Sequence, residues 1–173
     1  EIPTGKIFFN NIDINNIERK SFYEKFAYVM QDDYIYDNTV KHNIALYKNY
    51  NKNEINEATE KAELIDTIEK LDKKYDTLIG DNGIKLSGGQ KQRLILSRNL
   101  VTTPNILIID NGFTGLDIDT RKKVIKNLNT RNNKTTLVII SSMMEDIKNA
   151  DKIYKLENKT LVEINMEEVV HNA

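Results

Sequence analysis

The stretch from Leu86 to Asp117 constrains the fold more than any other part of the chain. It reads LSGGQKQRLILSRNLVTTPNILIIDNGFTGLD: a small-residue turn, a run with helical apolar spacing, Pro104, and a four-residue apolar run. The apolar run Ile106–Ile109, followed by Asp110, is typical of a buried parallel strand with a carboxylate at its carboxyl end. Ligands of open α/β sheets bind at that end, so the stretch predicts a binding site there.

Three small residues, Ser87, Gly88 and Gly89, stand directly before the expected helix. A helix start has unpaired N–H groups and a partial positive charge, so it can bind a phosphate group. Glycines allow the backbone to approach such an anion closely. A plain capped helix start is the alternative interpretation, because serine is a favourable N-cap residue. The motifs that accompany this turn favour phosphate binding.

Taken in order, LSGGQ with KQR, the ILIID strand and the TGLD segment resemble the ABC ATPase family. The resemblance implies an α/β, P-loop NTPase-like parallel-sheet core with a small inserted helical subdomain. It implies ATP and Mg²⁺ as ligands, and a signature turn that binds the γ-phosphate of ATP held by the other subunit. It assigns ATP contacts to Gln31, Ser87, Gly88, Gly89, Gln90 and Asp117. It assigns the metal to Asp110 and Gln31.

Composition excludes several classes of protein. The 173 residues give room for one sizeable domain. A net charge of −1 gives no electrostatic reason to expect a nucleic-acid partner. The absence of cysteine excludes disulfides and thiolate metal sites. The apolar runs are far shorter than the ~20 residues that a membrane-spanning helix needs.

The first residues resemble the segment that follows the phosphate loop in ABC exporters. Pro3, Gly5, Ile7 and the Asp13–Ile14 pair match that pattern. The phosphate loop itself, G-x-x-x-x-G-K-[ST], is found nowhere in the sequence, and Lys6 lacks both the upstream glycine and the following Ser or Thr. We therefore interpret the chain as an N-terminally incomplete domain that begins after its phosphate loop.

Two further segments resemble exporters. Residues 32–44, DDYIYDNTVKHNI, are similar to the exporter segment that receives the membrane domain, while ordinary subdomain core is the alternative for Tyr34, Ile35 and Tyr36. Residues 77–83, TLIGDNG, are similar to a loop typical of exporters. We expect a helical subdomain at about residues 32–95, a core at 1–31 and 96–165, and a polar tail at 166–173.

Periodicity predicts the remaining elements. Helices are expected at 16–26, 52–70 and 119–129, and in the run after the LSGGQ turn that includes Leu94, Ile95 and Leu100. Strands are expected as a pair within 5–14, at 27–30, as a buried strand at 135–141, and as a terminal hairpin over 153–164.

Two positions depart from the family pattern and decide the expected mechanism. The family carries a glutamate after the Walker B aspartate, as general base, and this chain has Asn111 there. The family carries a histidine that contacts the γ-phosphate, and this chain has Ser142 there. An amide can orient water but cannot take its proton, and losing such help typically costs ~10²–10⁴ in rate. No catalytic position is therefore intact, and the chain's own site is expected to be inactive or very slow.

The resemblance leaves three functions open. The first is the ATP-binding domain of an exporter, as a weakly hydrolysing half that supplies its signature to a partner's ATP site. The second is an ordinary hydrolysing motor domain of a homodimeric exporter, and the third is a soluble ABC-type ATPase. The implied partners are an exporter's transmembrane domain and a second nucleotide-binding domain, more readily in a heterodimer. The implied location is the cytoplasmic face of the cell membrane.

Overall fold

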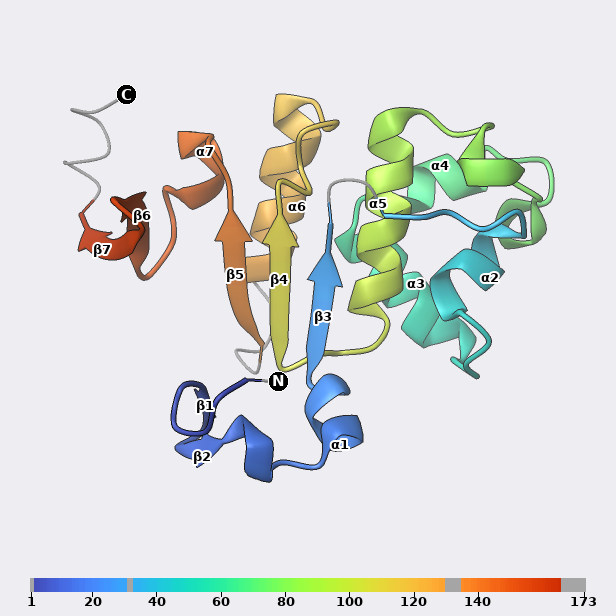
Figure 1. Cartoon of the computed structure of the whole chain (residues 1–173). Helices are drawn as coiled ribbons and strands as arrows, with labels where there is room; N and C mark the ends of the chain where they lie inside the picture. Colours follow the sequence, from blue (N-terminus) through green and yellow to red (C-terminus); the bar gives the residue numbers. More distant parts are fainter. Residues whose placement is uncertain (1, 31–32, 130–134, 166–173) are drawn as a thin grey trace.

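The computed structural model describes residues 2–30, 33–129 and 135–165. Its centre is a parallel sheet of three strands in the order β3 (Phe26–Val29), β4 (Ile106–Asp110) and β5 (Thr136–Ile140). Leu107 lies opposite Ala27 on one side and Leu137 on the other. The three strands run side by side in the same direction in Figure 1, which confirms the predicted α/β class with a parallel sheet.

Two long helices contribute much of the core beside the sheet. Helix α5 (Gly88–Leu100) packs against β3, and helix α6 (Ile118–Asn129) follows β4 (Figure 1). Helix α6 matches its predicted range closely, whereas α5 contains the predicted helical run but begins at Gly88, before the predicted start. Their apolar stripes are buried, as expected from helical spacing, and the buried residues include Leu94, Ile95, Leu100, Val124, Ile125 and Leu128.

A cluster of short helices lies on the far side of α5 (Figure 1). It contains α2 (Val40–Ala45), α3 (Lys52–Lys61) and α4 (Ile65–Glu69), and two of these, α2 and α3, pack against α5. The single helix predicted over residues 52–70 is wrong, because Glu63 adopts a left-handed conformation with φ of 56°. A left-handed residue ends a helix, so the chain forms two helices there. The boundaries of the helical subdomain stay a prediction.

The amino-terminal part lies at the amino end of β3 (Figure 1). Strands β1 (Phe8–Phe9) and β2 (Ile12–Asp13) pair antiparallel, as predicted, and a short 3-10 turn follows. Helix α1 (Arg19–Tyr23) is shorter than the predicted helix, because Phe26 already belongs to β3. The rings of Phe22 and Phe26 lie 4.5 Å apart and join the two elements.

The predicted hairpin near the carboxyl end is confirmed. Helix α7 (Met144–Ile147) leads to β6 (Ile153–Glu157) and β7 (Thr160–Ile164), which pair antiparallel. The two linking residues, Asn158 and Lys159, both have positive φ, which is the geometry of a two-residue type I′ hairpin turn. No helix in the described ranges is long and apolar enough to cross a membrane.

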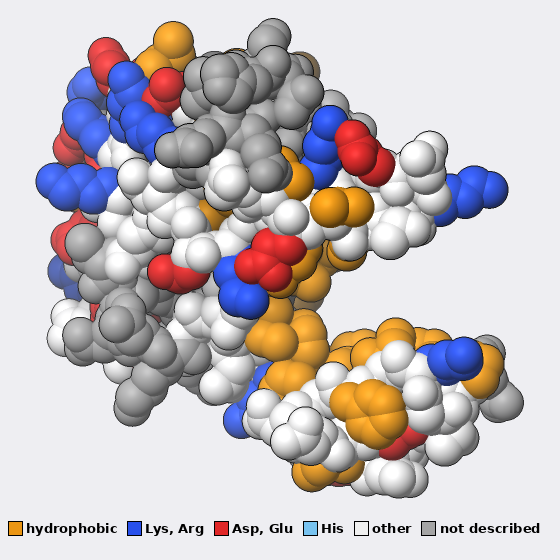
Figure 2. All heavy atoms as spheres, turned by 90° about the vertical axis from the view of Figure 1, so that its left-hand side faces the viewer, with side chains coloured by type: hydrophobic (Ala, Val, Ile, Leu, Met, Phe, Trp, Pro, Cys, Tyr) orange, Lys and Arg blue, Asp and Glu red, His pale blue; other side chains and the backbone are white. Residues whose placement is uncertain are grey.

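The two faces of the parallel sheet differ in exposure. Leu107 and Ile109 are fully buried on one face, whereas Tyr28, Val138 and Ile140 are exposed on the other. Figure 2 shows hydrophobic side chains gathered in a hollow of the molecule. The strand predicted over residues 135–141 is confirmed as β5, but its predicted burial is wrong, because side chains alternate between faces along a strand and only one face of β5 meets the core.

Candidate functional site

Asp110 is the last residue of β4, so its carboxylate lies at the carboxyl edge of the sheet. One carboxylate oxygen, Oδ2, accepts a hydrogen bond of 3.1 Å from the hydroxyl of Tyr28 on β3. The other, Oδ1, lies 3.4 Å from the side-chain amide nitrogen of Asn111. The hydrogen bond to Asp110 raises the pKa of Tyr28, because an ionised phenol could not donate it. The tyrosine therefore stays a neutral donor.

Asn111 occupies a tight turn directly after β4. Its φ is 49°, a left-handed conformation that asparagine tolerates better than most residues. Its amide donates to the carbonyl of Ile140 at 3.0 Å, so the turn is tied to β5. A Cβ at the next position, Gly112, would lie 2.7 Å from the Ile109 side chain. The turn thus needs a glycine after Asn111 and holds the Asn111 side chain beside Asp110.

The predicted phosphate-binding turn is a preformed helix start. Ser87 caps α5: its hydroxyl accepts from the Gln90 amide at 3.3 Å, and its own amide donates to the Gln90 side-chain oxygen at 2.9 Å. This reciprocal pair is a capping box. The Gln90 side chain, predicted to contact ATP, is thus used within the cap. The amides of Gly88 and Gly89 make no hydrogen bond within the described ranges and are available as donors.

The loop after β4 is held against this helix start by Gln92. The Gln92 side-chain oxygen accepts from the amide of Gly115 at 2.8 Å, and its nitrogen donates to the Thr114 hydroxyl at 3.1 Å. Gly89 lies so close that a Cβ there would be 2.7 Å from the Gly115 carbonyl oxygen. Gln92 is not among the site residues predicted from the sequence, although its position one turn after Gly89 places both on the same helix face.

Asp117 ends that loop and begins α6. Its carboxylate accepts a hydrogen bond of 2.9 Å from the amide of Thr120, as an N-cap does. This backbone hydrogen bond lowers the pKa of Asp117, because it favours the ionised carboxylate. Asp117 is exposed, so it could meet a ligand or a neighbouring subunit, but within this chain its contacts are those of a helix cap.

Ser142 lies exposed in the turn after β5. The turn is anchored by Ser141, whose hydroxyl donates to Asp146 at 2.6 Å and accepts from the Met143 amide at 3.0 Å. Asp146 is buried and lies 3.6 Å from the guanidinium of Arg121 on α6. Ser142 therefore stands on a turn that is well fixed at both sides.

A second buried arginine joins α5 to the segment that follows Gln31. Arg98 donates to the carbonyls of Tyr34 and Asn43, each at 2.8 Å. Burial lowers the pKa of Arg98, while Asp33 at 3.7 Å opposes that shift. Tyr34 and its neighbour Tyr36 are exposed.

Of the apolar trio at residues 34–36, only Ile35 is buried core; Tyr34 is 53% exposed and Tyr36 is 44% exposed. The sequence left core and docking surface open for all three residues. The structure places Ile35 in the core and leaves Tyr34 and Tyr36 exposed, and a docking role for the two tyrosines stays a prediction.

The predicted metal position can be tested only in part. Gln31 lies outside the described residues. In the described ranges, no group of three or more His, Cys, Asp or Glu side chains could hold a metal ion. Mg²⁺ usually keeps several waters and takes only one or two carboxylates together with substrate phosphates. A single carboxylate such as Asp110, reachable at the sheet edge, fits that kind of site and does not fit an all-protein cage.

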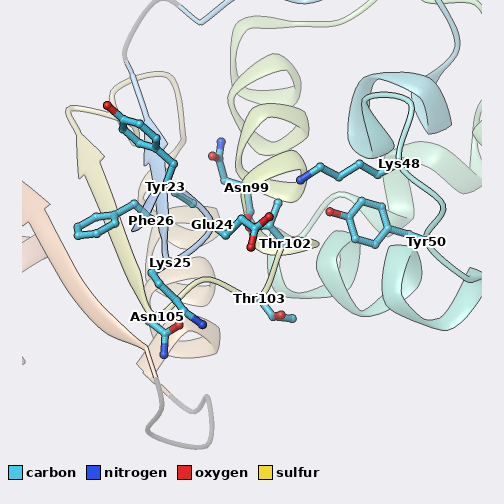
Figure 3. A pocket seen from close by; sticks show the side chains of 11 residues that line it. Tyr23, Glu24, Lys25, Phe26, Lys48, Tyr50, Asn99, Thr102, Thr103 and Asn105 are labelled. Atoms are coloured by element: carbon cyan, nitrogen blue, oxygen red, sulfur yellow. The ribbon is translucent and has the colours of Figure 1, made fainter. Parts of the chain in front are cut away.

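A pocket of about 410 Å³ lies at the other end of the sheet. Figure 3 shows Tyr23, Lys25 and Phe26 around it, together with Lys48 and Tyr50 from the helical cluster. It borders the amino end of β3, whereas Asp110 is at the carboxyl end of β4. None of the predicted site residues lines this pocket.

Together, an open parallel sheet, a carboxylate at its carboxyl edge and a glycine-rich helix start define an α/β protein built to bind phosphate groups. Residues 1–114 match the sequence model of the family described as ABC transporter. The chain belongs to the ABC transporter family.

Curated relatives and a solved structure agree with this assignment. The chain is 37% identical, over 93% of its length, to the β-(1→2)glucan export ATP-binding/permease protein NdvA of Bartonella bacilliformis. It is 33% identical, over 94%, to the ATP-dependent lipid A-core flippase of Photorhabdus laumondii. A bacterial Atm1-family ABC exporter with ATP bound superimposes with a TM-score of 0.86 at 28% identity over 94% of the chain. The ABC ATPase fold is thereby confirmed.

The chain spans only part of these proteins. It covers 27% of the NdvA protein, 28% of the flippase and 29% of the exporter chain.

Proposed function

We propose that this chain is the ATP-binding domain of an exporter and that it hydrolyses ATP little or not at all at its own site. The observation that carries the proposal is the pair Asp110 and Asn111: a carboxylate that can hold a metal, followed by an amide that cannot act as a base. The relatives named above are export proteins or a flippase, and they support the export function.

In this proposal the chain keeps the side chains that bind Mg²⁺ and ATP and lacks the side chains that would help to cleave ATP. Asp110 would hold Mg²⁺ directly or through water, with Gln31 as a second contact. The ion, when bound, neutralises charge on the β- and γ-phosphates. Asn111 can orient a water molecule but cannot accept its proton, and exposed Ser142 is too short and uncharged to replace a histidine at the γ-phosphate.

The second part of the proposal is that the signature turn acts on a partner's ATP. The cap formed by Ser87 and Gln90 holds the helix start in place before any ligand arrives. The amides of Gly88 and Gly89 remain free to donate, and the space beside Gly88 is open. A charge-assisted hydrogen bond from such a group to a phosphate is worth roughly 1.5–3 kcal/mol.

The partners in this proposal are a transmembrane domain and a second nucleotide-binding domain, at the cytoplasmic face of the membrane. A heterodimer is favoured because a partner with glutamate and histidine at the positions equivalent to Asn111 and Ser142 would carry out the hydrolysis. Exposed Tyr34 and Tyr36 are the proposed contact with the membrane domain. The alternatives remain a homodimeric exporter motor and a soluble ABC-type ATPase. The relatives that are exporters disfavour the soluble ATPase.

The test is the ATPase activity of the complete assembled transporter carrying single substitutions. Ser87→Arg should lower total turnover by about 10²-fold or more, because bulk at the turn obstructs donors to the partner's phosphate. Asn111→Ala should change turnover by far less. Asn51→Arg is the matched control, since Asn51 also forms a capping box, with Glu54 on α3. Equal losses from Ser87→Arg and Asn111→Ala would contradict the proposal that the signature turn acts on a partner's ATP. A loss from Asn51→Arg equal to that from Ser87→Arg would mean that the loss comes only from a missing helix cap.

A further inference from the structure

We propose that Tyr28 is a positioning residue for the magnesium site: its hydroxyl fixes the orientation in which the Asp110 carboxylate receives the metal. The inference rests on the proposed function, because it takes Asp110 as a metal ligand. It assigns a role to a residue on the neighbouring strand that the sequence motifs do not include.

The geometry of the sheet brings the two residues together. Tyr28 pairs in register with Ile108, and Asp110 lies two residues further along the same strand. Residues two apart in a strand share a face, so Asp110 lies diagonally across the gap between the strands from Tyr28, on the same face of the sheet. A tyrosine can cross that gap, and its hydroxyl reaches Asp110 Oδ2 at 3.1 Å. The hydrogen bond therefore follows from the strand register.

The hydrogen bonds around Asp110 leave it able to bind a cation. Within the described part of the chain its two side-chain contacts, from Tyr28 and Asn111, come from neutral groups and reach different oxygens. An ionised carboxylate has about four acceptor positions, so each oxygen still has a free lone pair.

Tyr28 is the firmer of the two supports. The Asn111 contact is 3.4 Å long and comes from the next residue in the chain, whereas the Tyr28 contact is 3.1 Å and joins two strands. Burial does not force the Tyr28 hydroxyl to bond to Asp110, because Tyr28 is 42% exposed and water could satisfy the hydroxyl. Residues that orient a metal ligand in this way typically contribute about 10–100-fold to metal affinity.

The experiment measures Mn²⁺, as a paramagnetic replacement for Mg²⁺, binding with ATP to the product of the complete gene. Tyr28→Phe removes only the hydroxyl and should weaken Mn²⁺ binding by about 10-fold. The same change in an Asp110→Asn background should have no effect, because the hydroxyl then has no carboxylate to orient. Electron paramagnetic resonance titration gives the free Mn²⁺ concentration without any need for turnover.

Tyr154→Phe is the matched control. Tyr154 is also exposed on a strand, and its hydroxyl lies 3.5 Å from Glu163 on the paired strand, within the hairpin β6–β7. It should leave Mn²⁺ binding unchanged.

Unchanged Mn²⁺ affinity in Tyr28→Phe, or an equal loss with and without the Asp110 carboxylate, would overturn the inference while leaving the proposed function intact. Failure of the unaltered protein to bind Mn²⁺ with ATP would instead overturn the proposed function itself.

Discussion

Gln92 accepts a hydrogen bond of 2.8 Å from the amide of Gly115 and thereby ties the signature helix to the loop after β4. The same loop presses its Gly115 carbonyl against Gly89 at the helix start. The two segments proposed to face a partner subunit, the signature turn and the segment that ends at Asp117, are consequently held together as one surface. A substitution that displaces one segment should therefore displace the other.

The contrast between two adjacent glycines tests this packing. Gly89→Ala places a Cβ 2.7 Å from the Gly115 carbonyl oxygen, whereas Gly88→Ala points into open space. Overpacking typically costs about 1–3 kcal/mol, so Gly89→Ala should lower the free energy of unfolding by that amount. Gly88→Ala should be neutral or slightly stabilising, because alanine favours a helix by up to ~1 kcal/mol over glycine. Urea denaturation of both variants measures the difference, and equal stabilities would contradict the close approach.

Restoring the family's glutamate at position 111 and its histidine at position 142 should raise ATP hydrolysis at this chain's own site. Asn111→Glu together with Ser142→His should increase single-site turnover at least ~10-fold, because it supplies a base and a γ-phosphate contact. The two changes act on one transition state, so their effects should not be additive. The gain is reduced by the left-handed conformation at Asn111, with φ of 49°, which a longer side chain adopts at a cost of about 1–2 kcal/mol.

The matched control for that gain replaces Asn111 with glutamine. Asn111→Gln with Ser142→His has the same side-chain length and backbone strain at position 111 but no proton acceptor there. Its turnover should stay well below that of the glutamate variant in a single-turnover assay of the complete protein. If the glutamine and glutamate variants hydrolyse ATP equally, the missing base is not what limits hydrolysis.

Asp117 should contribute to stability in a pH-dependent way. Its pKa is lowered in the folded chain by the Thr120 amide, relative to an ordinary value of about 3.9. The stabilisation is therefore fully present above the unfolded pKa and is lost as the pH falls through the lower folded pKa. Asp117→Asn still caps the helix but cannot titrate. The melting temperature of Asp117→Asn should lie below that of the unaltered chain near about pH 6, and the two should converge near about pH 2. The control is Asp72→Asn, which makes the same change at an exposed aspartate just after α4. A difference that is constant with pH, or that Asp72→Asn reproduces, would contradict this assignment.

Several features were predictable from sequence because they depend on neighbours in the chain. The run Ile106–Asp110 identified a parallel strand with a carboxylate at its end, and Ser87 followed by two glycines identified a helix start. Both were confirmed, since strand pattern and capping are set within a few residues. Asn111 and Ser142 are read directly from the sequence. The loss of hydrolysis that they imply stays a prediction.

Two predictions that rested on apolar spacing alone were wrong. The apolar spacing over residues 52–70 is continuous, yet the left-handed Glu63 divides it into α3 and α4. The apolar run at 135–141 suggests burial on both faces, yet Val138 and Ile140 are exposed. Spacing reports which residues are apolar, and it does not report how many faces of a strand are covered.

The sequence by itself determined the class of fold, the capped helix start at Ser87 and the carboxylate at the end of β4. The metal-binding role of Asp110 and the loss of catalysis at Asn111 and Ser142 stay predictions from sequence. Only the tertiary structure decided what surrounds these residues: Tyr28 lies 82 residues from Asp110 in sequence, and Gln92 lies 23 residues from Gly115. These contacts depend on strand register and on helix placement over the sheet. Both are settled by packing the whole core, because neither residue has a local reason to seek its partner.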